Sequence, residues 1–162
     1  MVIFKWLNEN FEKVFTTILF MAFSGLMIIN VLMILISNEA ISWASEGVML
    51  LFVFFVWVAI SYAFKERKHI SVTALTDMFP EKGRKMMSII VNFIVIAFFA
   101  VLAYAGIELL LHPSVLNKSS LLIQYPMWLF YFSAPLGASL SIIRLLQNTI
   151  EDLKNFNKET TV

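Results

Sequence analysis

Ionisable residues divide the chain into long uncharged runs separated by short charged segments. The four runs, which hold 25, 18, 22 and 25 residues, are Val14–Asn38, Gly47–Phe64, Met86–Ile107 and Ser119–Ile143. A helix rising 1.5 Å per residue needs about 20 residues to cross a hydrocarbon core of roughly 30 Å. Each run reaches or nearly reaches that length, so the pattern predicts four transmembrane helices. The predicted spans are about residues 14–37, 47–64, 86–108 and 121–144.

The first run could also be the apolar core of a cleaved signal peptide, because Lys5 and Lys13 precede it. Such cores hold only about 7–15 residues. The run that begins at Val14 is far longer, and three further runs follow it. We therefore expect a retained helix at this position.

Two charged segments outside the runs carry apolar residues at helical spacing. In residues 1–13 these are Ile3, Leu7 and Phe11. This stripe predicts a short interfacial helix or, equally, an extension of the first span. In residues 65–85 basic clusters flank an apolar stripe of Val72, Leu75, Met78 and Phe79. Pro80 ends any helix there. We interpret this second segment as an amphipathic helix on the membrane surface, with its basic residues near phospholipid headgroups.

Lysine and arginine counts in the short loops predict the orientation. The N-terminal segment, the stretch 65–85 and the C-terminal segment together hold 11 of the 12 basic residues. The other side has only Lys118. The richer side is expected to be cytoplasmic, which places both chain ends there, and the net charge of +1 conceals this asymmetry.

Composition supports the membrane assignment, since 60% of residues are hydrophobic and 14% are charged, against about 25% charged in soluble domains. We expect an all-α membrane protein, with residues 1–156 forming one four-helix domain. Residues 157–162 are polar or charged apart from the last one, and we predict a disordered cytoplasmic tail there.

Candidate catalytic chemistry is sparse in the sequence. Cysteine is absent, and the two histidines, His69 and His112, fall on opposite sides of the predicted membrane. No carboxylate lies within an uncharged run, whereas proton and sodium relays normally leave ionisable groups inside the bilayer. The polar candidates within the predicted spans are Asn30, Asn92 and Gln124, and such amides more often join helices than bind substrate.

The residues favour an accessory or scaffold subunit over an enzyme, and we expect no cofactor, no metal and no nucleic acid. Two alternatives stay open. One is the membrane anchor of a redox enzyme, and the other is a small autonomous transporter.

Several motifs, in order, resemble the small membrane subunit (DctQ-like) of tripartite ATP-independent periplasmic (TRAP) transporters. The resemblance covers nearly the whole chain. It rests on Trp43-Ala44-Ser45-Glu46, Phe52-Val53-Phe54-Phe55-Val56-Trp57, Lys68-His69-Ile70-Ser71-Val72, Phe79-Pro80, Ile123-Gln124-Tyr125-Pro126-Met127-Trp128 and Ala134-Pro135-Leu136-Gly137. The chain departs from the pattern at Ala59, Ser71 and Thr73, where the family often has Gly, Arg and Asp.

The resemblance implies a bacterial inner-membrane subunit that pairs with a large membrane subunit carrying the sodium and substrate sites. A periplasmic binding protein would deliver an organic acid, such as sialic acid or a C4-dicarboxylate. The small subunit would act as scaffold for an elevator-like transport domain.

Ten residues are candidates for contacts with a partner or with lipid. At the outer face these are Trp43, Glu46, Pro126 and Trp128. At the inner surface they are Lys65, Arg67, Lys68 and His69. Trp57 lies within the second span, and Pro135 is central in the fourth, where it is expected to kink the helix.

Overall fold

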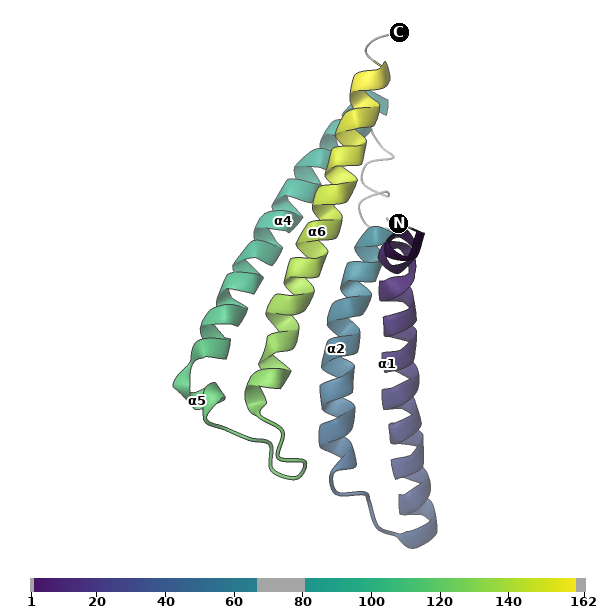
Figure 1. Ribbon diagram of the computed structural model, residues 1–162, viewed down its shortest axis with the longest axis vertical. Helices are drawn as coiled ribbons and strands as arrows, with labels where there is room; N and C mark the ends of the chain where they lie inside the picture. The colour runs from purple at the N-terminus through teal and green to yellow at the C-terminus, as the bar shows by residue number, and fades with distance from the viewer. Residues whose placement is uncertain (1, 67–80, 160–162) are drawn as a thin grey trace.

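The computed structural model describes residues 2–66 and 81–159 (Figure 1). Its helices are α1 (Val2–Ser37), α2 (Ala44–Lys65), α4 (Glu81–Leu111), α5 (Pro113–Leu116) and α6 (Met127–Glu159). The described part of the chain has no strand, only an isolated bridge between Ser119 and Pro126. The predicted all-α fold is therefore confirmed.

Four helices are long and apolar enough to cross a membrane, which confirms the predicted number of spans. These segments are Asn10–Ser37, Ala44–Lys65, Ile89–Leu111 and Met127–Ile150. The start of α1 and the end of α6 lie at the same end of the molecule, as an even number of spans requires (Figure 1). Arg67, Lys68, His69 and the predicted amphipathic stripe that follows them lie outside the described residues.

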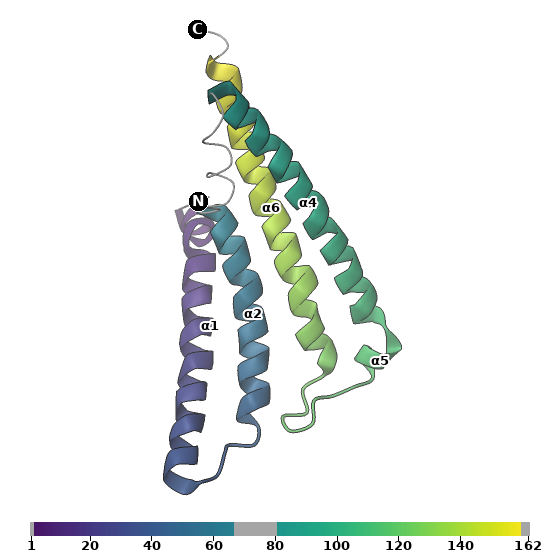
Figure 2. The same ribbon diagram turned by 180° about the vertical axis from the view of Figure 1, so that it is seen from behind.

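The long helices form an open layer in the order α1, α2, α6, α4 (Figures 1 and 2). Helix α2 packs against α1 on one side and α6 on the other, and α4 packs against α6. Helices α1 and α4 are thus the two edges of the layer. Each edge helix has one long helical neighbour, so most of its surface is left for lipid or another protein.

Both limits of the last long helix differ from the sequence prediction. Helix α6 begins at Met127, not near residue 121, because Pro126 has no amide hydrogen and the residues before it form a loop. It continues through Pro135 to Glu159, past residue 157, where the disordered tail was predicted to begin. Helix α1 is continuous from Val2, although its first turns run out of line with the rest (Figures 1 and 2).

A small apolar core joins the three helices α2, α4 and α6. It consists of Phe64, Phe99, Ala138 and Leu145, which are all at most 6% exposed. The rings of Phe64 and Phe99 meet edge to face with centroids 5.3 Å apart, a favourable aromatic geometry. Helices α1 and α2 meet through a separate aromatic cluster of Phe20, Phe23, Phe52 and Phe55.

The segment Ala134–Gly137 lets α6 approach both neighbouring helices. A Cβ atom at Gly106 of α4 would lie 3.0 Å from the ring of Pro135. On the other side, a Cβ at Gly137 would collide with the Cβ of Trp57 on α2 and lie 2.9 Å from its Cγ. Small residues allow such close helix contacts inside membranes. Trp57 and Pro135 therefore have helix-packing roles within this chain.

Candidate functional site

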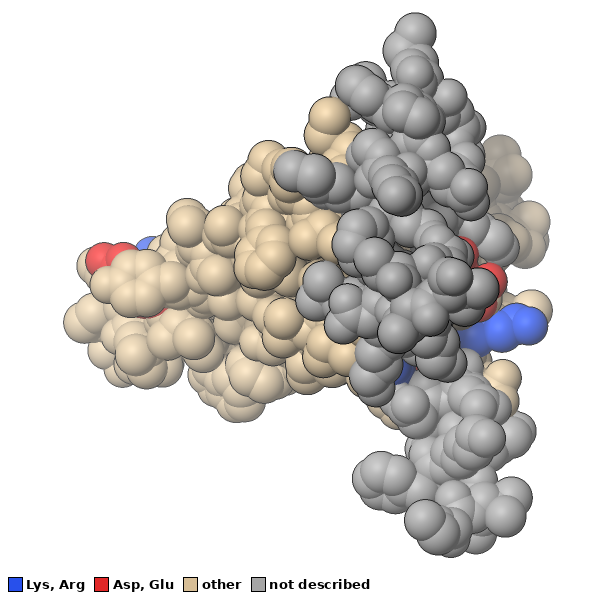
Figure 3. All heavy atoms as spheres, turned by 90° about the horizontal axis from the view of Figure 1, so that it is seen from above, with Lys and Arg blue, Asp and Glu red and all other residues tan. Residues whose placement is uncertain are grey.

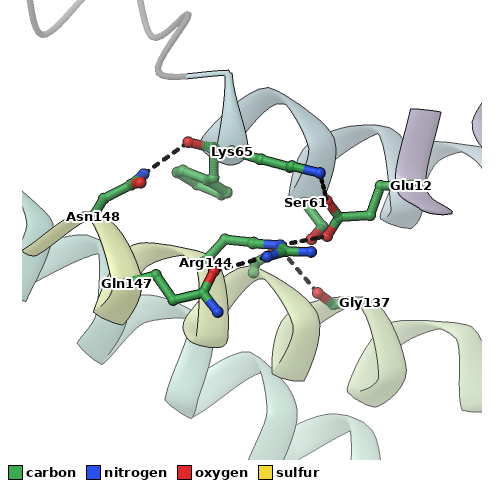
Figure 4. A network of polar contacts seen from close by, with 9 residues as sticks. Glu12, Ser61, Lys65, Gly137, Arg144, Gln147 and Asn148 are labelled. Atoms are coloured by element: carbon green, nitrogen blue, oxygen red, sulfur yellow. Dashed lines mark hydrogen bonds and ion pairs between the residues drawn. The ribbon is translucent and has the colours of Figure 1, made fainter. Parts of the chain in front are cut away.

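A cluster of charged and polar side chains joins α1, α2 and α6 at the end of the layer where the chain begins (Figure 4). We call it the Arg144 cluster. Glu12 of α1 is 1% exposed, and its Oε1 accepts hydrogen bonds of 2.9 Å from both Ser61 Oγ and Arg144 Nε. Its Oε2 accepts no hydrogen bond from the described residues and lies 3.7 Å from Lys65 Nζ.

Helix α6 supplies further polar contacts at the same depth. The guanidinium Nη1 of Arg144 donates a hydrogen bond of 2.7 Å to Gln147 Oε1. Asn148 Nδ2 donates 2.8 Å to the carbonyl oxygen of Phe64, near the end of α2 where the last carbonyls lack helical partners. The cluster therefore ties the two central helices together and fastens α1 to them.

This cluster corrects one interpretation of the sequence. We expected charges only outside the spans, but Glu12, Lys65 and Arg144 all lie inside the structural spans. The helices continue beyond the uncharged runs, and their end charges neutralise one another across helix contacts. From above, the described Lys, Arg, Asp and Glu side chains occupy only small patches of the visible surface (Figure 3).

At the opposite end of the layer, Glu46 holds the loop that precedes α6. Its carboxylate accepts hydrogen bonds from three consecutive backbone amides, those of Leu121 (2.9 Å), Leu122 (3.1 Å) and Ile123 (2.9 Å). Such charge-assisted bonds to backbone amides are stronger than neutral ones. This contact between Glu46 and the loop could not be recognised from the sequence, because Glu46 and these amides are 75 to 77 residues apart.

The rest of this loop is also held by its own chain. The amide of Ser120 donates to the carbonyl of Tyr125 at 2.9 Å, and that of Met127 donates to Lys118 at 2.9 Å. Gln124 lies in the left-handed region with a φ of 61°, where the chain reverses direction. Burial and the nearby Glu46 carboxylate raise the pKa of the Tyr125 phenol above its ordinary value.

A second polar contact fixes the connection between α1 and α2 at this end. The side-chain oxygen of Asn30 accepts a 2.8 Å hydrogen bond from the amide of Ile41. Asn30 is thus a structural residue that closes the turn after α1. Asn92 is half-buried on α4, and Gln124 lies in the loop before α6 instead of within a span.

The predicted outer-face residues come together at the Glu46 end. Trp43 occupies the N-cap position of α2 and is 48% exposed, and Trp128 lies in the first turn of α6 and is 40% exposed. Pro126 directly precedes α6. Lys65 lies at the other end of the layer, in the Arg144 cluster. The structure thus brings together four of the predicted residues in one region and Lys65 with residues that the sequence did not single out.

No group of three or more His, Cys, Asp and Glu side chains among the described residues could hold a metal ion. His112 has a local role, since its ring accepts a hydrogen bond from the amide of Ser114 and caps the short helix α5. What the described groups do chemically is to neutralise one another and fix helix ends.

Comparison with known proteins identifies the family. Residues 12–155 match the family described as tripartite ATP-independent periplasmic transporters, DctQ component. The chain belongs to the DctQ family. This confirms the resemblance found in the sequence, and the family is one of transporter components, not of enzymes. A DctQ-family chain with four apolar spans is a multi-pass protein of the bacterial inner membrane, as predicted.

Three relatives illustrate the range of the family. The sialic acid TRAP transporter permease protein SiaT of Haemophilus influenzae is 30% identical over 104 residues, covering 64% of this chain and 17% of the relative. The isethionate TRAP transporter permease protein DctMQ of Oleidesulfovibrio alaskensis is 25% identical over 152 residues, which cover 90% of this chain and 24% of the relative. The C4-dicarboxylate TRAP transporter small permease protein DctQ of Rhodobacter capsulatus is 27% identical over 105 residues, which cover 65% of this chain and 46% of the relative. The matched region thus spans less than half of each relative.

Proposed function

We propose that this chain is the small membrane subunit of a sodium-coupled TRAP transporter that takes up an organic acid delivered by a periplasmic binding protein. In this proposal a large membrane subunit carries the sodium and substrate sites. The DctQ-family chain enlarges the fixed part of the complex against which the transport domain moves.

The open helix layer is the observation that carries the proposal. Helices α1 and α4 are edges, and both have large apolar side chains that are more than half exposed, including Leu35, Ile36, Ile94 and Tyr104. A layer of this kind offers broad apolar surface on both faces, which suits attachment to a larger membrane protein.

The buried charges support a scaffold role over a transport role. Glu12, Arg144 and Lys65 bind one another across three helices, so they stabilise the layer. Proton and ion pathways in membrane proteins usually use ionisable groups that face a water-filled cavity. A rigid support needs charges that are paired within the protein, as these are.

The relatives support both the partner and the substrate class. The match covers only 24% of the chain named DctMQ and 17% of the chain named SiaT, so each of these permease proteins has a much larger part beyond the similar region. Sialic acid, isethionate and C4-dicarboxylates are all organic acids. For this chain we propose an organic acid of the sialic acid or C4-dicarboxylate type.

The proposal is tested by co-expressing the chain with candidate large subunits and purifying through a tag on this chain. A stable stoichiometric complex is expected. Proteoliposomes holding both membrane subunits should take up labelled organic acid only with the binding protein and an inward sodium gradient. Vesicles with either membrane subunit alone serve as controls.

The same preparations separate the two alternative functions. Sodium-independent uptake by this chain alone would replace the proposal with an autonomous transporter. A haem absorbance band in the purified chain would favour a redox anchor. If no large subunit co-purifies, the scaffold role is wrong.

A further inference from the structure

The loop before α6 exposes apolar side chains at its tip. We call residues 119–126 the 119–126 loop. Leu121 is 89% exposed, Leu122 53% and Ile123 41%. Three consecutive large apolar residues on an exposed loop would be unfavourable in water, at about 25 cal/mol per Å² of exposed apolar surface. Their exposure needs a physical explanation.

Four backbone amides of this loop have hydrogen-bond partners within the protein. The four consecutive amides from Ser120 to Ile123 all donate to protein acceptors, three of them to the Glu46 carboxylate. A loop in water has no such requirement, because water satisfies its amides. Irregular backbone exposed to lipid does not occur deep in the hydrocarbon region of a bilayer. A loop can still insert at the boundary between headgroups and acyl chains, and amides that are paired within the protein lower the cost of moving it there from water.

The loop also lacks charged side chains that would favour water over the membrane. From Ser119 to Ile143 the sequence has no ionisable Asp, Glu, Lys, Arg or His side chain, and Glu46 is occupied by the amides. Trp43 and Trp128 lie near the loop and are 48% and 40% exposed. Tryptophan collects at the boundary between the headgroups and the hydrocarbon core.

The depth of the loop in the molecule can be compared with that of α1. In both views of the ribbon, α1 extends along the long axis beyond the tip of the 119–126 loop (Figures 1 and 2). The last turn of α1 includes Leu35 and Ile36, which are 73% and 79% exposed. The loop tip thus lies no farther out than a part of the chain that already presents apolar side chains to its surroundings.

We propose that the 119–126 loop is inserted at the boundary between headgroups and acyl chains, where Leu121 and Leu122 contact the outer part of the acyl chains in the leaflet at the Glu46 end. Glu46 acts as a positioning residue, because its carboxylate takes the place of water for three loop amides. The proposal needs only that the chain spans a membrane. It does not depend on the TRAP partner or substrate.

The absence of cysteine allows a direct test. Single variants Leu121→Cys, Ile28→Cys and Lys118→Cys each receive a nitroxide spin label in the full chain, reconstituted in phosphatidylethanolamine and phosphatidylglycerol vesicles. Oxygen concentrates in hydrocarbon and a nickel chelate in water, so their collision rates with the label report depth. Ile28, 60% exposed on α1, is the lipid reference, and exposed Lys118 is the aqueous one.

The oxygen-to-nickel ratio at position 121 is expected to lie below that at Ile28, which is deeper in the span, and several-fold above that at position 118. A ratio equal to that at Lys118 would overturn the proposal. The measurement is repeated with the co-expressed large subunit. Loss of oxygen access at position 121 only in that complex would also overturn it, because protein would then cover the tip.

Glu46→Gln, combined with the label at position 121, tests the positioning role. A carboxamide has a single acceptor oxygen and cannot bind three amides as the carboxylate does. The oxygen-to-nickel ratio should fall toward the aqueous value. The matched control is Glu39→Gln, an exposed carboxylate between α1 and α2, which should leave the ratio unchanged. Equal ratios in the two variants would remove Glu46 from the proposal.

Discussion

The carboxylate of Glu12 links three helices. It belongs to α1, accepts from Ser61 of α2 and pairs with Arg144 of α6. In the part of the chain that the structure describes, α1 packs along its length only against α2, so the bond to Arg144 is a direct link from α1 to α6. The ion pair is at most 10% exposed on either side chain, so loss of Glu12 leaves the buried Arg144 charge without its carboxylate partner.

Glu12→Gln should therefore lower the free energy of unfolding by about 3–5 kcal/mol, the usual effect of breaking a buried ion pair from one side. The double variant Glu12→Gln/Arg144→Met should recover most of that loss, because an uncharged pair needs no compensation. Unfolding of the purified chain in detergent micelles, followed by circular dichroism, measures both.

Glu39→Gln is the control for these two variants, since Glu39 is an exposed carboxylate that follows α1 closely in the sequence. Surface substitutions of this kind usually change stability by at most about 0.5 kcal/mol. If Glu12→Gln is as mild as Glu39→Gln, the Arg144 cluster does not hold the layer together.

At the scale of single residues, little of the Arg144 cluster or of the Glu46 contact could be predicted from the sequence. Glu12 and Arg144 are 132 residues apart, and each looks like an ordinary charge flanking a span. Glu46 was recognised through the family motif, but its role with the amides of residues 121–123 depends on a fold that brings two distant loops together. The predicted site residues Trp43 and Trp128 do lie at the expected end, because tryptophan at a span boundary is a local signal.

At the scale of elements, α6 is the helix on which the layer depends. It packs between α2 and α4, and its Ala134–Gly137 segment provides the close approach on both sides. Gly137 faces Trp57 with no room for a Cβ atom, whereas Gly25 of α1 has no atom within 4 Å of a Cβ built there. The two glycines are thus a matched pair, one in a helix contact and one in open space.

Gly137→Ala should destabilise the protein by about 1–3 kcal/mol, as overpacking of a filled contact does. Gly25→Ala should stabilise it by about 0.5–1 kcal/mol, because alanine loses less backbone entropy in a helix. The two variants are compared by thermal unfolding in the same detergent. Opposite signs support the close contact between α2 and α6, and equal effects would contradict it.

The number of spans could be predicted because an uncharged run of about 20 residues has few alternatives. The helix limits could not, since charged residues at the helix ends are stabilised by partners on other helices. The order of the helices in the layer, α1, α2, α6, α4, could not be predicted from the sequence either. The helix surfaces are apolar on most sides, so no face of α2 or α6 distinguishes its neighbours in the sequence alone.

At the scale of the whole molecule, the layer has two chemically different ends. One end holds the Arg144 cluster, the first turns of α1 and the last turns of α6. The other holds Glu46, the 119–126 loop and the two exposed tryptophans. The basic residues divide 11 to 1 between the two sides of the membrane. The positive-inside rule therefore predicts that the Arg144 end is cytoplasmic and the Glu46 end periplasmic.

Single cysteines test this orientation in a chain that has none of its own. Lys118→Cys lies in the connection before α6, and Lys154→Cys lies near the end of α6. In intact cells a membrane-impermeant maleimide should label position 118 and leave position 154 unlabelled until the inner membrane is permeabilised. Both positions lie outside the uncharged runs, so unequal labelling reports the side of the membrane. The reverse pattern would mean that charge bias does not orient this chain, and it would move the 119–126 loop to the cytoplasmic leaflet.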